Sequence, residues 1–322
     1  MITPEISVVV CTFNRAEMLA DALASLTRLE THAAFTYEIV VVDNASTDRT
    51  PAVVADLAAM SSLFRYVREE RKGIVPARNR GIREARGKYI AFFDDDQLAL
   101  PQWLHALWTT AEERGAGCVG GPVHLKLPEG CDRKLQPVVR MLLGESDWSQ
   151  TPTKYDNKRC PGAGNMLLAR EWLDRVGVFD EAFNVRGEDT DLFLRLFAAG
   201  CEAWYAPDAV VLHVMTAQRL EDAYVLRLAD WMGGSVAEKE FRVANRAKFA
   251  ARRFLKQARR VLSEMPQFGL AKLRGEPESL LNERCRSAIS AAYGRRSGEL
   301  LSSPRASAAP TLAGTALHRT TA

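Results

Sequence analysis

Long hydrophobic runs are missing from this sequence of 322 residues. No stretch approaches the ~20 consecutive apolar residues that a helix needs to cross a bilayer. Residues 1–15 also lack the basic start and the apolar core of a signal peptide. These absences lead us to expect a cytoplasmic protein, with peripheral binding at the inner face of the cell membrane as its closest approach to lipid.

Paired cysteines and glycine-rich nucleotide loops are also absent. The six cysteines form no C-x-x-C pair and fit no zinc-ligand spacing, so we expect reduced, mostly buried thiols. No G-x-G-x-x-G segment follows a strand pattern, which argues against a nicotinamide-binding domain. The net charge of +3 is small and says little about partners; we expect no nucleic-acid partner, because no aromatic stacking pattern supports one.

What the first part of the chain does contain is an alternation of strand and helix patterns. Continuously apolar, β-branched stretches are typical of strands buried on both faces, as in parallel sheets. This rhythm predicts an α/β fold, Rossmann-like, with a mainly parallel sheet flanked by helices. The predicted strands are 6–12, 37–44, 64–70 and 88–94, and the predicted helices are 14–29, 45–60 and 73–87, the last closed by Gly87.

The rest of the chain divides into regions of different character. Further elements are predicted as a helix at 102–115, a strand at 116–125, an irregular stretch at 126–160, a helix at 186–200 and a strand region at 202–214. From about 217 the patterns are only helical, and the last twenty residues are small, polar and proline-containing. We therefore expect an α/β domain at 1–216, a helical region at 217–300 and a disordered tail at 301–322.

Three adjacent carboxylates, Asp94, Asp95 and Asp96, follow the strand at 88–94. Like charges this close repel one another unless a cation compensates them. Hard oxygen ligands suit Mg²⁺ or Mn²⁺, which complete their coordination with substrate phosphates and water. In an extended segment Asp94 and Asp96 share one side and Asp95 the other. The pattern predicts either a metal–diphosphate site or a solvated acidic turn.

Other polar side chains come at the ends of the first two strands, where ligands bind in α/β sheets. Asp43 could accept hydrogen bonds from a pyrimidine base or from ribose hydroxyls, or it could bond only to the following turn. Thr12 and Asn14 end the first strand and would line the same pocket. Arg15 starts the next helix and either reaches the nucleotide or stays exposed.

Three further segments contain residues that are either functional or purely structural. Arg78 lies where a loop enters a helix and could pair with a phosphate or with the acidic cluster, or be an ordinary surface arginine. Glu188 and Asp189 begin a helix with a clear apolar face, which suits catalytic acids and capping acids alike. A loop of small residues would let a backbone approach a sugar ring or form a plain turn; it comprises Gly162, Ala163, Gly164 and Asn165.

The ordered series of these segments resembles the inverting family 2 glycosyltransferases, which have the GT-A fold. Each segment alone is weak, but seven in order at suitable spacings are specific. They cover roughly residues 5–215, and the C-terminal third matches no pattern of the family. The segments are VVVCTFNR (8–15), VVVDNASTD (40–48), GIVPARNRGI (73–82), IAFFDDDQLALPQWL (90–104), GAGNMLLAR (162–170), VGVFDE (176–181) and GEDTDLFLRL (187–196).

The resemblance implies roles for individual residues. Asp189 would be the general base, with Glu188 and Asp191 as supporting acids; Glu188 as the base is the alternative. Asp96 and Asp94 would bind a divalent metal, Mn²⁺ or Mg²⁺. His213 would complete the metal shell or touch the diphosphate, unless it is a core histidine. The nucleotide would be bound by Thr12, Asn14, Arg15, Asp43, Arg78, Asp94 and Asp95, and the acceptor by Gly162, Ala163, Gly164, Asn165 and Asp191.

We therefore expect a metal-dependent, inverting glycosyltransferase of the hexosyltransferase type. Its donor would be a nucleotide-diphosphate sugar, UDP-linked in the first instance because Asp43 suits uracil. Its acceptor would be a hydroxyl of a glycan or a lipid-linked sugar in polysaccharide or cell-surface glycan synthesis. The alternatives are a nucleotidyltransferase, disfavoured by the lack of glycine after Thr12, and a non-catalytic scaffold that binds membrane or polyanion.

A basic helical segment in the C-terminal region bears on the last alternative. Residues 241–260 contain eight Lys or Arg and no acid, and an apolar strip includes Phe254 and Leu262 at helical spacing. Such a helix could lie on an anionic membrane surface or pack on the α/β domain with its charges in water. Upstream, Gly233 and Gly234 predict a break in the helix.

Overall fold

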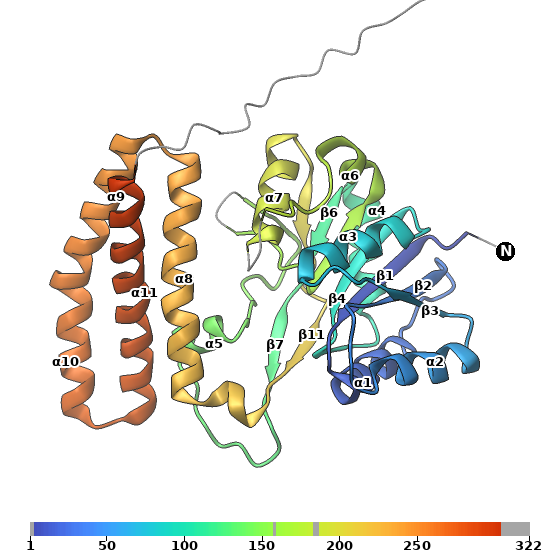
Figure 1. The fold of residues 1–322 in the computed structure, drawn as a ribbon, viewed down its shortest axis with the longest axis horizontal. Helices are drawn as coiled ribbons and strands as arrows, with labels where there is room; N and C mark the ends of the chain where they lie inside the picture. The colour runs from blue at the N-terminus through green and yellow to red at the C-terminus, as the bar shows by residue number, and fades with distance from the viewer. Residues whose placement is uncertain (1–2, 157–158, 183–186, 304–322) are drawn as a thin grey trace, which may run out of the picture.

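The computed structural model describes residues 3–156, 159–182 and 187–303 (Figure 1). A sheet domain with helices around it occupies one side of the molecule, and a bundle of long helices formed by the C-terminal part of the chain stands beside it. The tail predicted as disordered falls almost wholly outside the described residues, since only 301–303 are included.

The strands form two sheets. The larger has the order β3-β2-β1-β4-β9-β6-β10-β8, in which β3, β2, β1 and β4 run parallel and β9 is antiparallel to both of its neighbours. The smaller has the order β5-β11-β7. The bounds are β1 Ile6–Thr12, β2 Tyr37–Asp43, β3 Phe64–Arg68, β4 Tyr89–Asp94, β5 Gln97–Ala99, β6 Cys118–Gly120, β7 Val123–Lys126, β8 Thr153–Lys154, β9 Asn165–Ala169, β10 Ala203–Tyr205 and β11 Val211–Val214.

Helices flank the sheet in the first part of the chain. After β11, the elements in the described part of the chain are all helical. Those of the sheet domain are α1 Ala16–Leu26, α2 Thr50–Met60, α3 Ile74–Glu84, α4 Trp103–Arg114, α5 Pro137–Leu142, α6 Arg170–Val176 and α7 Glu188–Ala198. Those of the C-terminal part are η1 Ala217–Leu220, α8 Asp222–Val243, α9 Arg246–Arg259, η2 Arg260–Glu264, α10 Met265–Arg274 and α11 Pro277–Ser302.

Alternation along the central strands explains why helices cover both faces of the sheet. Val8 and Val10 of β1 lie in one apolar cluster with the buried side chains of α1 and α4. Val9 of the same strand lies in a second cluster, with residues of α3 and α7. Because β1, β2 and β4 are parallel and in register, Thr12 pairs with Asp43 and Cys11 with Asp94 at one edge. The sheet therefore gathers the predicted polar positions at its carboxyl end.

The expected α/β alternation is confirmed, with local corrections. Gly87 does not close a helix, since α3 ends at Glu84; a Cβ there would lie 2.6 Å from the Ser7 nitrogen, so the glycine permits close backbone packing. The stretch predicted as one strand at 116–125 is two, β6 and β7, in different sheets. The stretch predicted as irregular contains α5 and β8.

The expected break at Gly233 and Gly234 is wrong, because α8 runs unbroken from Asp222 to Val243. A Cβ at Gly233 would lie 2.1 Å from the Ile289 carbonyl oxygen of α11. The glycine is therefore a close-packing site between two helices rather than a helix end. The expected basic helix is also divided, because its first residues belong to α8 and α9 begins at Arg246. Among the residues that the structure describes, no helix is both long enough and apolar enough to cross a bilayer.

Candidate active site

A large cleft opens at the carboxyl end of the central strands. Its volume is about 1430 Å³, above the range of ~300–1,000 Å³ that is usual for small-ligand sites. The end of β1, the β4–β5 turn, the loop before β9, the start of α7 and one face of α8 contribute to its wall. Of the predicted site residues it is lined by Thr12, Arg15, Arg78, Asp94, Asp95, Asp96, Gly162, Ala163, Gly164, Asn165, Glu188, Asp189, Asp191 and His213.

Arginine side chains form ion pairs with all three aspartates. Nη1 of Arg15 lies 2.6 Å from Oδ1 of Asp95 and 3.0 Å from Oδ2 of Asp96. Nη2 of Arg219 donates to the same Oδ2 at 2.7 Å. Because β4 ends at Asp94 and the chain turns there, Asp95 and Asp96 face one guanidinium, and the predicted extended alternation of their side chains is wrong.

Burial and neighbouring charge separate the acidities of these carboxyls. Burial raises the pKa of Asp95 to about 6, against the opposing charge of Arg15. Burial also acts to raise the pKa of Asp96, but His213, Arg219 and Arg15 together hold that pKa well below its usual range. Asp96 is therefore ionised at neutral pH, the form in which a carboxylate attracts a cation.

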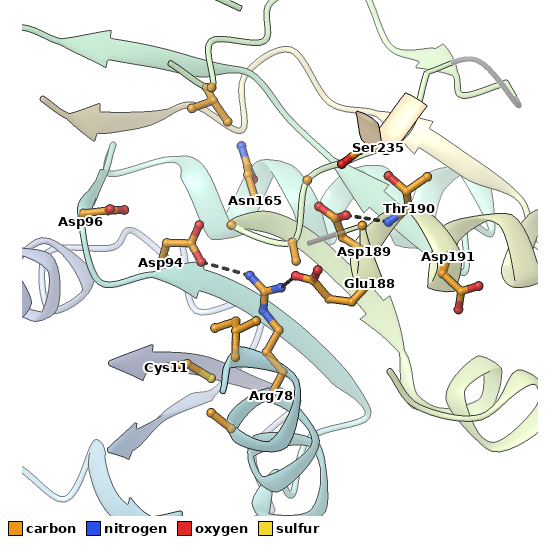
Figure 2. A pocket seen from close by; sticks show the side chains of 18 of the residues that line it. Cys11, Arg78, Asp94, Asp96, Asn165, Glu188, Asp189, Thr190, Asp191 and Ser235 are labelled. Carbon is orange, nitrogen blue, oxygen red and sulfur yellow. Dashed lines mark hydrogen bonds and ion pairs between the residues drawn. The ribbon is translucent and has the colours of Figure 1, made fainter. Parts of the chain in front are cut away.

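Arg78 of α3 links the two acidic parts of the cleft (Figure 2). Its Nη1 donates to Oε1 of Glu188, and its Nη2 lies 3.4 Å from Oδ1 of Asp94. Arg78 and Glu188 are both buried, so this is an ion pair withdrawn from water. Burial raises the pKa of Glu188, and the charge of Arg78 opposes that effect. Arg78 is therefore not an ordinary surface arginine, which was the alternative left open by the sequence.

Asp189 is the more accessible member of the acid pair at the start of α7. It is half-buried, and its Oδ1 accepts a hydrogen bond of 2.6 Å from the Thr190 nitrogen. Gly187 precedes the helix with φ of 96°, a conformation that few other residues adopt. Both side chains line the cleft (Figure 2), but Glu188 is buried and pairs with Arg78, whereas Asp189 is half-buried and makes no ion pair with Arg78.

The small-residue loop lines the cleft, and its predicted contact with the acceptor stays a prediction. A Cβ at Gly164 would lie 2.3 Å from Oδ2 of Asp94, so this glycine leaves room for a carboxylate. The Asn165 side chain accepts from the Trp103 indole and donates to the carbonyls of Pro122 and Ala209. Its polar atoms are thus engaged in holding the wall of the cleft.

Two predicted nucleotide contacts are not brought into the cleft. Asp43 is fully buried, and its carboxylate accepts from the Ser46 nitrogen and from the hydroxyl of Tyr66. Asn14 is exposed, and its side chain accepts from the Thr47 nitrogen. The bond from Ser46 is the local turn contact that was the alternative for Asp43. For both Asp43 and Asn14, a contact with the nucleoside stays a prediction.

The predicted metal ligands Asp94, Asp96 and His213 all line the cleft. Nε2 of His213 lies 3.5 Å from Oδ2 of Asp96, and Asp94 lines the same cleft. Across the described ranges no group of three or more His, Cys, Asp or Glu side chains is arranged to hold a metal. A cation here would therefore rely on substrate phosphates and water for the rest of its shell, as Mg²⁺ and Mn²⁺ do in nucleotide sites.

Sequence reasoning missed Arg219 and the contribution of α8. Arg219 lies 2.8 Å from His213 and 2.7 Å from Asp96, but no spacing in the sequence connects it with either residue. The cleft-facing residues of α8 recur at helical spacing, from Tyr224 through Leu228 and Trp231 to Ser235. That periodicity was readable from the sequence.

The structure thus combines an α/β sheet with an acidic cleft at the carboxyl ends of its central strands. The family model described as Glycosyl transferase family 2 matches residues 7–177, and one described as Glycosyl transferase family group 2 matches residues 153–273. The first match covers more than half of the chain, so the protein belongs to glycosyltransferase family 2. The predicted family and the prediction of a glycosyltransferase are thereby confirmed.

Individual relatives agree with this assignment. Glycosyltransferase AglE of Haloferax volcanii is 28% identical over 213 residues, which cover 65% of this chain and 67% of that protein. The succinoglycan biosynthesis protein ExoM of Rhizobium meliloti is 28% identical over 233 residues, covering 70% and 72%. A chondroitin synthase of Pasteurella multocida is also 28% identical, over 61% of this chain, but the chain spans only 23% of that enzyme.

A solved structure supports the fold. The mannosyltransferase PcManGT from Pyrobaculum calidifontis, in complex with GDP-Man and Mn²⁺, superposes with a TM-score of 0.61 and covers 92% of this chain and 87% of its own. Its sequence identity is 19%, so the likeness concerns the fold alone. It confirms the predicted GT-A architecture.

Proposed function

We propose that this protein is a metal-dependent, inverting glycosyltransferase that moves a sugar from a nucleotide-diphosphate donor to an acceptor hydroxyl in glycan or polysaccharide synthesis. The observation that carries the proposal is that Asp189 and the Asp94–Asp96 cluster line one cleft of about 1430 Å³. A donor and an acceptor can therefore bind in the same cleft, between the proposed proton acceptor Asp189 and the carboxylates proposed to hold a cation. The names of AglE and ExoM support a role in glycan assembly.

The residues of the cleft divide the chemistry between them. Asp189 takes the proton from the acceptor hydroxyl as that oxygen attacks the anomeric carbon from the side opposite the diphosphate, which inverts the centre. Such a base contributes ~10²–10⁴-fold to the rate. Arg15 and Arg219, which now pair with aspartates, are placed to stabilise negative charge on the leaving phosphate.

A divalent cation, Mn²⁺ or Mg²⁺, would be held by Asp96, Asp94 and His213. When bound, it would offset the charge of the nucleotide diphosphate. The suitable donor set and the Mn²⁺ named with the mannosyltransferase of the same fold support this. We keep UDP-sugars as the first donors to test. GDP-sugars should be tested as well, because the mannosyltransferase of the same fold was solved in complex with GDP-Man.

We also propose that the protein works at the inner face of the cell membrane, bound through the segment of α9, η2 and α10. Residues 246–274 contain nine Lys or Arg and a single acid, Glu264, which is buried. Large apolar side chains on the same segment are exposed, including Phe254 at 72%, Leu262 at 78% and Leu273 at 84%. The predicted packing of this strip on the α/β domain is therefore not supported. Exposed apolar groups among cations match an anionic lipid surface.

A donor panel tests the activity. The protein is incubated with Mn²⁺ and UDP-, GDP- and dTDP-sugars, and released nucleotide is measured with and without EDTA. Metal-dependent release from one class of donor is the expected result. Absence of release from every donor, together with salt-sensitive binding to anionic vesicles, would favour the non-catalytic alternative.

A further inference from the structure

One buried amide in the cleft has an oxygen without a partner. Gln97 begins β5, directly after the three aspartates, and lines the cleft. The residue is only 4% exposed, yet its Oε1 accepts no hydrogen bond from the residues that the structure describes. Because a buried polar atom without a partner destabilises a fold, stability does not explain why a glutamine stands at this position.

A second buried amide in the same cleft shows the usual arrangement. Asn165, at the start of β9, accepts a hydrogen bond from the Trp103 indole. Its Nδ2 donates to the carbonyl oxygens of Pro122 and Ala209. The amide of Asn165 therefore joins β9 to α4 and to the segments before β7 and β11. The oxygen of the Gln97 amide, although just as buried, holds no such segments together.

The neighbours of Gln97 define where its amide lies. Gln97 pairs with His213 across the antiparallel strands β5 and β11, which places both side chains on one face. A Cβ at Gly164 would lie 2.7 Å from Nε2 of Gln97 and 2.3 Å from Oδ2 of Asp94, so both polar atoms lie against one backbone position. It is Oδ1 of Asp94, the other oxygen, that faces Arg78. The amide thus lies beside an outward carboxylate oxygen.

An amide in this place matches the hydroxyl groups of a sugar better than it matches a charge. The side chain of glutamine is neutral, and it donates through nitrogen and accepts through oxygen. A sugar hydroxyl also donates and accepts, so Gln97 can bond to two neighbouring hydroxyls at once. The aspartates beside it only accept when they are ionised. Gln97 therefore adds a neutral donor and acceptor to a cluster of acids.

The proposed cation ligands indicate which sugar this is. Asp96 precedes Gln97 in the chain, and His213 lies opposite it on β11. A diphosphate held by a cation at these two residues would carry its sugar one bridging oxygen away, beside Gln97. The acceptor, in contrast, is activated at Asp189. The hydroxyls within reach of the Gln97 amide are therefore those of the transferred sugar.

We propose that Gln97 is a specificity-determining residue, which binds hydroxyl groups of the transferred sugar through its amide. This assignment deepens the proposed function and rests on it. A donor with hydroxyls in the matching place gives Oε1 its missing partner. A donor without them leaves the buried amide unpaired and is bound less tightly.

Affinities of sugar nucleotides and of bare nucleotides test this role. Isothermal titration calorimetry with Mn²⁺ compares UDP-glucose, UDP-galactose, UDP-N-acetylglucosamine, GDP-mannose and dTDP-glucose with UDP, GDP and dTDP. Gln97→Met removes the amide and keeps the length of the side chain. For the sugar that adds most affinity, we expect the ratio of sugar nucleotide to nucleotide affinity to fall about tenfold or more, as for the loss of two neutral hydrogen bonds. Affinity for the bare nucleotide should stay within twofold.

Thermal unfolding separates recognition of a ligand from a structural role. Gln97→Met takes away no hydrogen bond of Oε1, so its Tm should stay within about 1 °C of the unaltered protein or rise. Asn165→Leu is the matched comparison, because it leaves the Trp103 indole and two carbonyls without their partner. Its Tm should fall by about 4 °C or more.

Gln102→Met controls for the exchange itself, since Gln102 is exposed, pairs with Glu30 and is not among the residues that line the cleft. It should change neither the affinity ratio nor the Tm. An affinity ratio that Gln97→Met leaves unchanged for every sugar would overturn the assignment of Gln97, as would a fall in Tm equal to that of Asn165→Leu. Failure of every nucleotide to bind the unaltered protein would instead overturn the proposed function, and the role of Gln97 with it.

Discussion

Arg78 and Glu188 form a buried ion pair that ties α3 to the first turn of α7. The second amino group of Arg78 lies 3.4 Å from Asp94. One guanidinium thus connects the acidic end of β4 with the residue directly before the candidate base. The contact links the two halves of the cleft and engages one of the two carboxylate oxygens of Glu188.

This pair should be strongly coupled in stability. Arg78→Met or Glu188→Met leaves one buried charge without its partner, which typically costs ~3–5 kcal/mol. The double variant removes both charges and should be less destabilised than either single variant. Guanidinium denaturation of the four proteins measures this directly. Additive losses in the double variant would show that the two side chains act independently.

The proposed metal site gives a second prediction. Asp96→Asn removes the charge of one proposed ligand, and His213→Ala removes the imidazole of another, so each should raise the Mn²⁺ concentration for half-maximal activity at least tenfold. Equilibrium binding of Mn²⁺ in the presence of the nucleotide diphosphate gives a readout without turnover. His124→Ala is the control, since His124 pairs with Asp147 and does not line the cleft. Unchanged Mn²⁺ binding in both site variants would place the cation elsewhere.

A third prediction concerns stability and pH. The buried Glu38 carboxylate accepts from the Ser7 hydroxyl, the Arg65 guanidinium and the Arg86 nitrogen. Burial acts to raise the pKa of Glu38, but these hydrogen bonds outweigh it and lower that pKa from 4.5. A lowered folded-state pKa contributes stability above the unfolded-state value and loses it as the pH falls through the folded-state value.

Glu38→Gln should therefore lower the free energy of unfolding by about 1–3 kcal/mol at pH 7, and by less as the pH drops below 4.5. Urea titrations of both proteins from pH 7 to pH 3.5 make the comparison. Glu70→Gln serves as a control, because Glu70 carries an exposed ion pair with Arg68. A destabilisation by Glu38→Gln that stays constant over this range would rule out the carboxylate charge as its source.

The proposed membrane-binding segment of α9, η2 and α10 gives a fourth prediction. Leu262→Glu combined with Phe254→Glu should abolish binding to phosphatidylglycerol vesicles, while binding of the unaltered protein should weaken as salt rises. Met60→Glu is matched in exposure, at 83%, but lies on α2 of the sheet domain and should have no effect. Equal binding of all three proteins in vesicle sedimentation would exclude this segment as the docking surface.

Features of the fold and the site that depend on neighbouring residues in the sequence could be predicted, whereas those that depend on contacts between distant residues could not. Strands such as Ile6–Thr12 were predictable, because a β-branched run buried on both faces is a local signal. Gly233 was misread as a helix break, because its reason lies in α11, about sixty residues later in the chain. For Asp43 the sequence left a ligand contact and a local turn open, because the hydroxyl of Tyr66 reaches its carboxylate only from the neighbouring strand. Arg219 was missed because Asp96, 123 residues earlier in the chain, is brought to it only by the fold.

The central claim is that Asp189 is the proton acceptor of the transfer reaction, and Asp189→Asn tests it most directly. We expect kcat to fall ~10²–10⁴-fold while the dissociation constant of the nucleotide donor stays within twofold. Asp191→Asn is the comparison in the same helix turn, since that side chain pairs with Arg195, and it should lose less than tenfold. An Asp189→Asn protein that retains full kcat, or that loses activity only through weaker donor binding, would contradict the account.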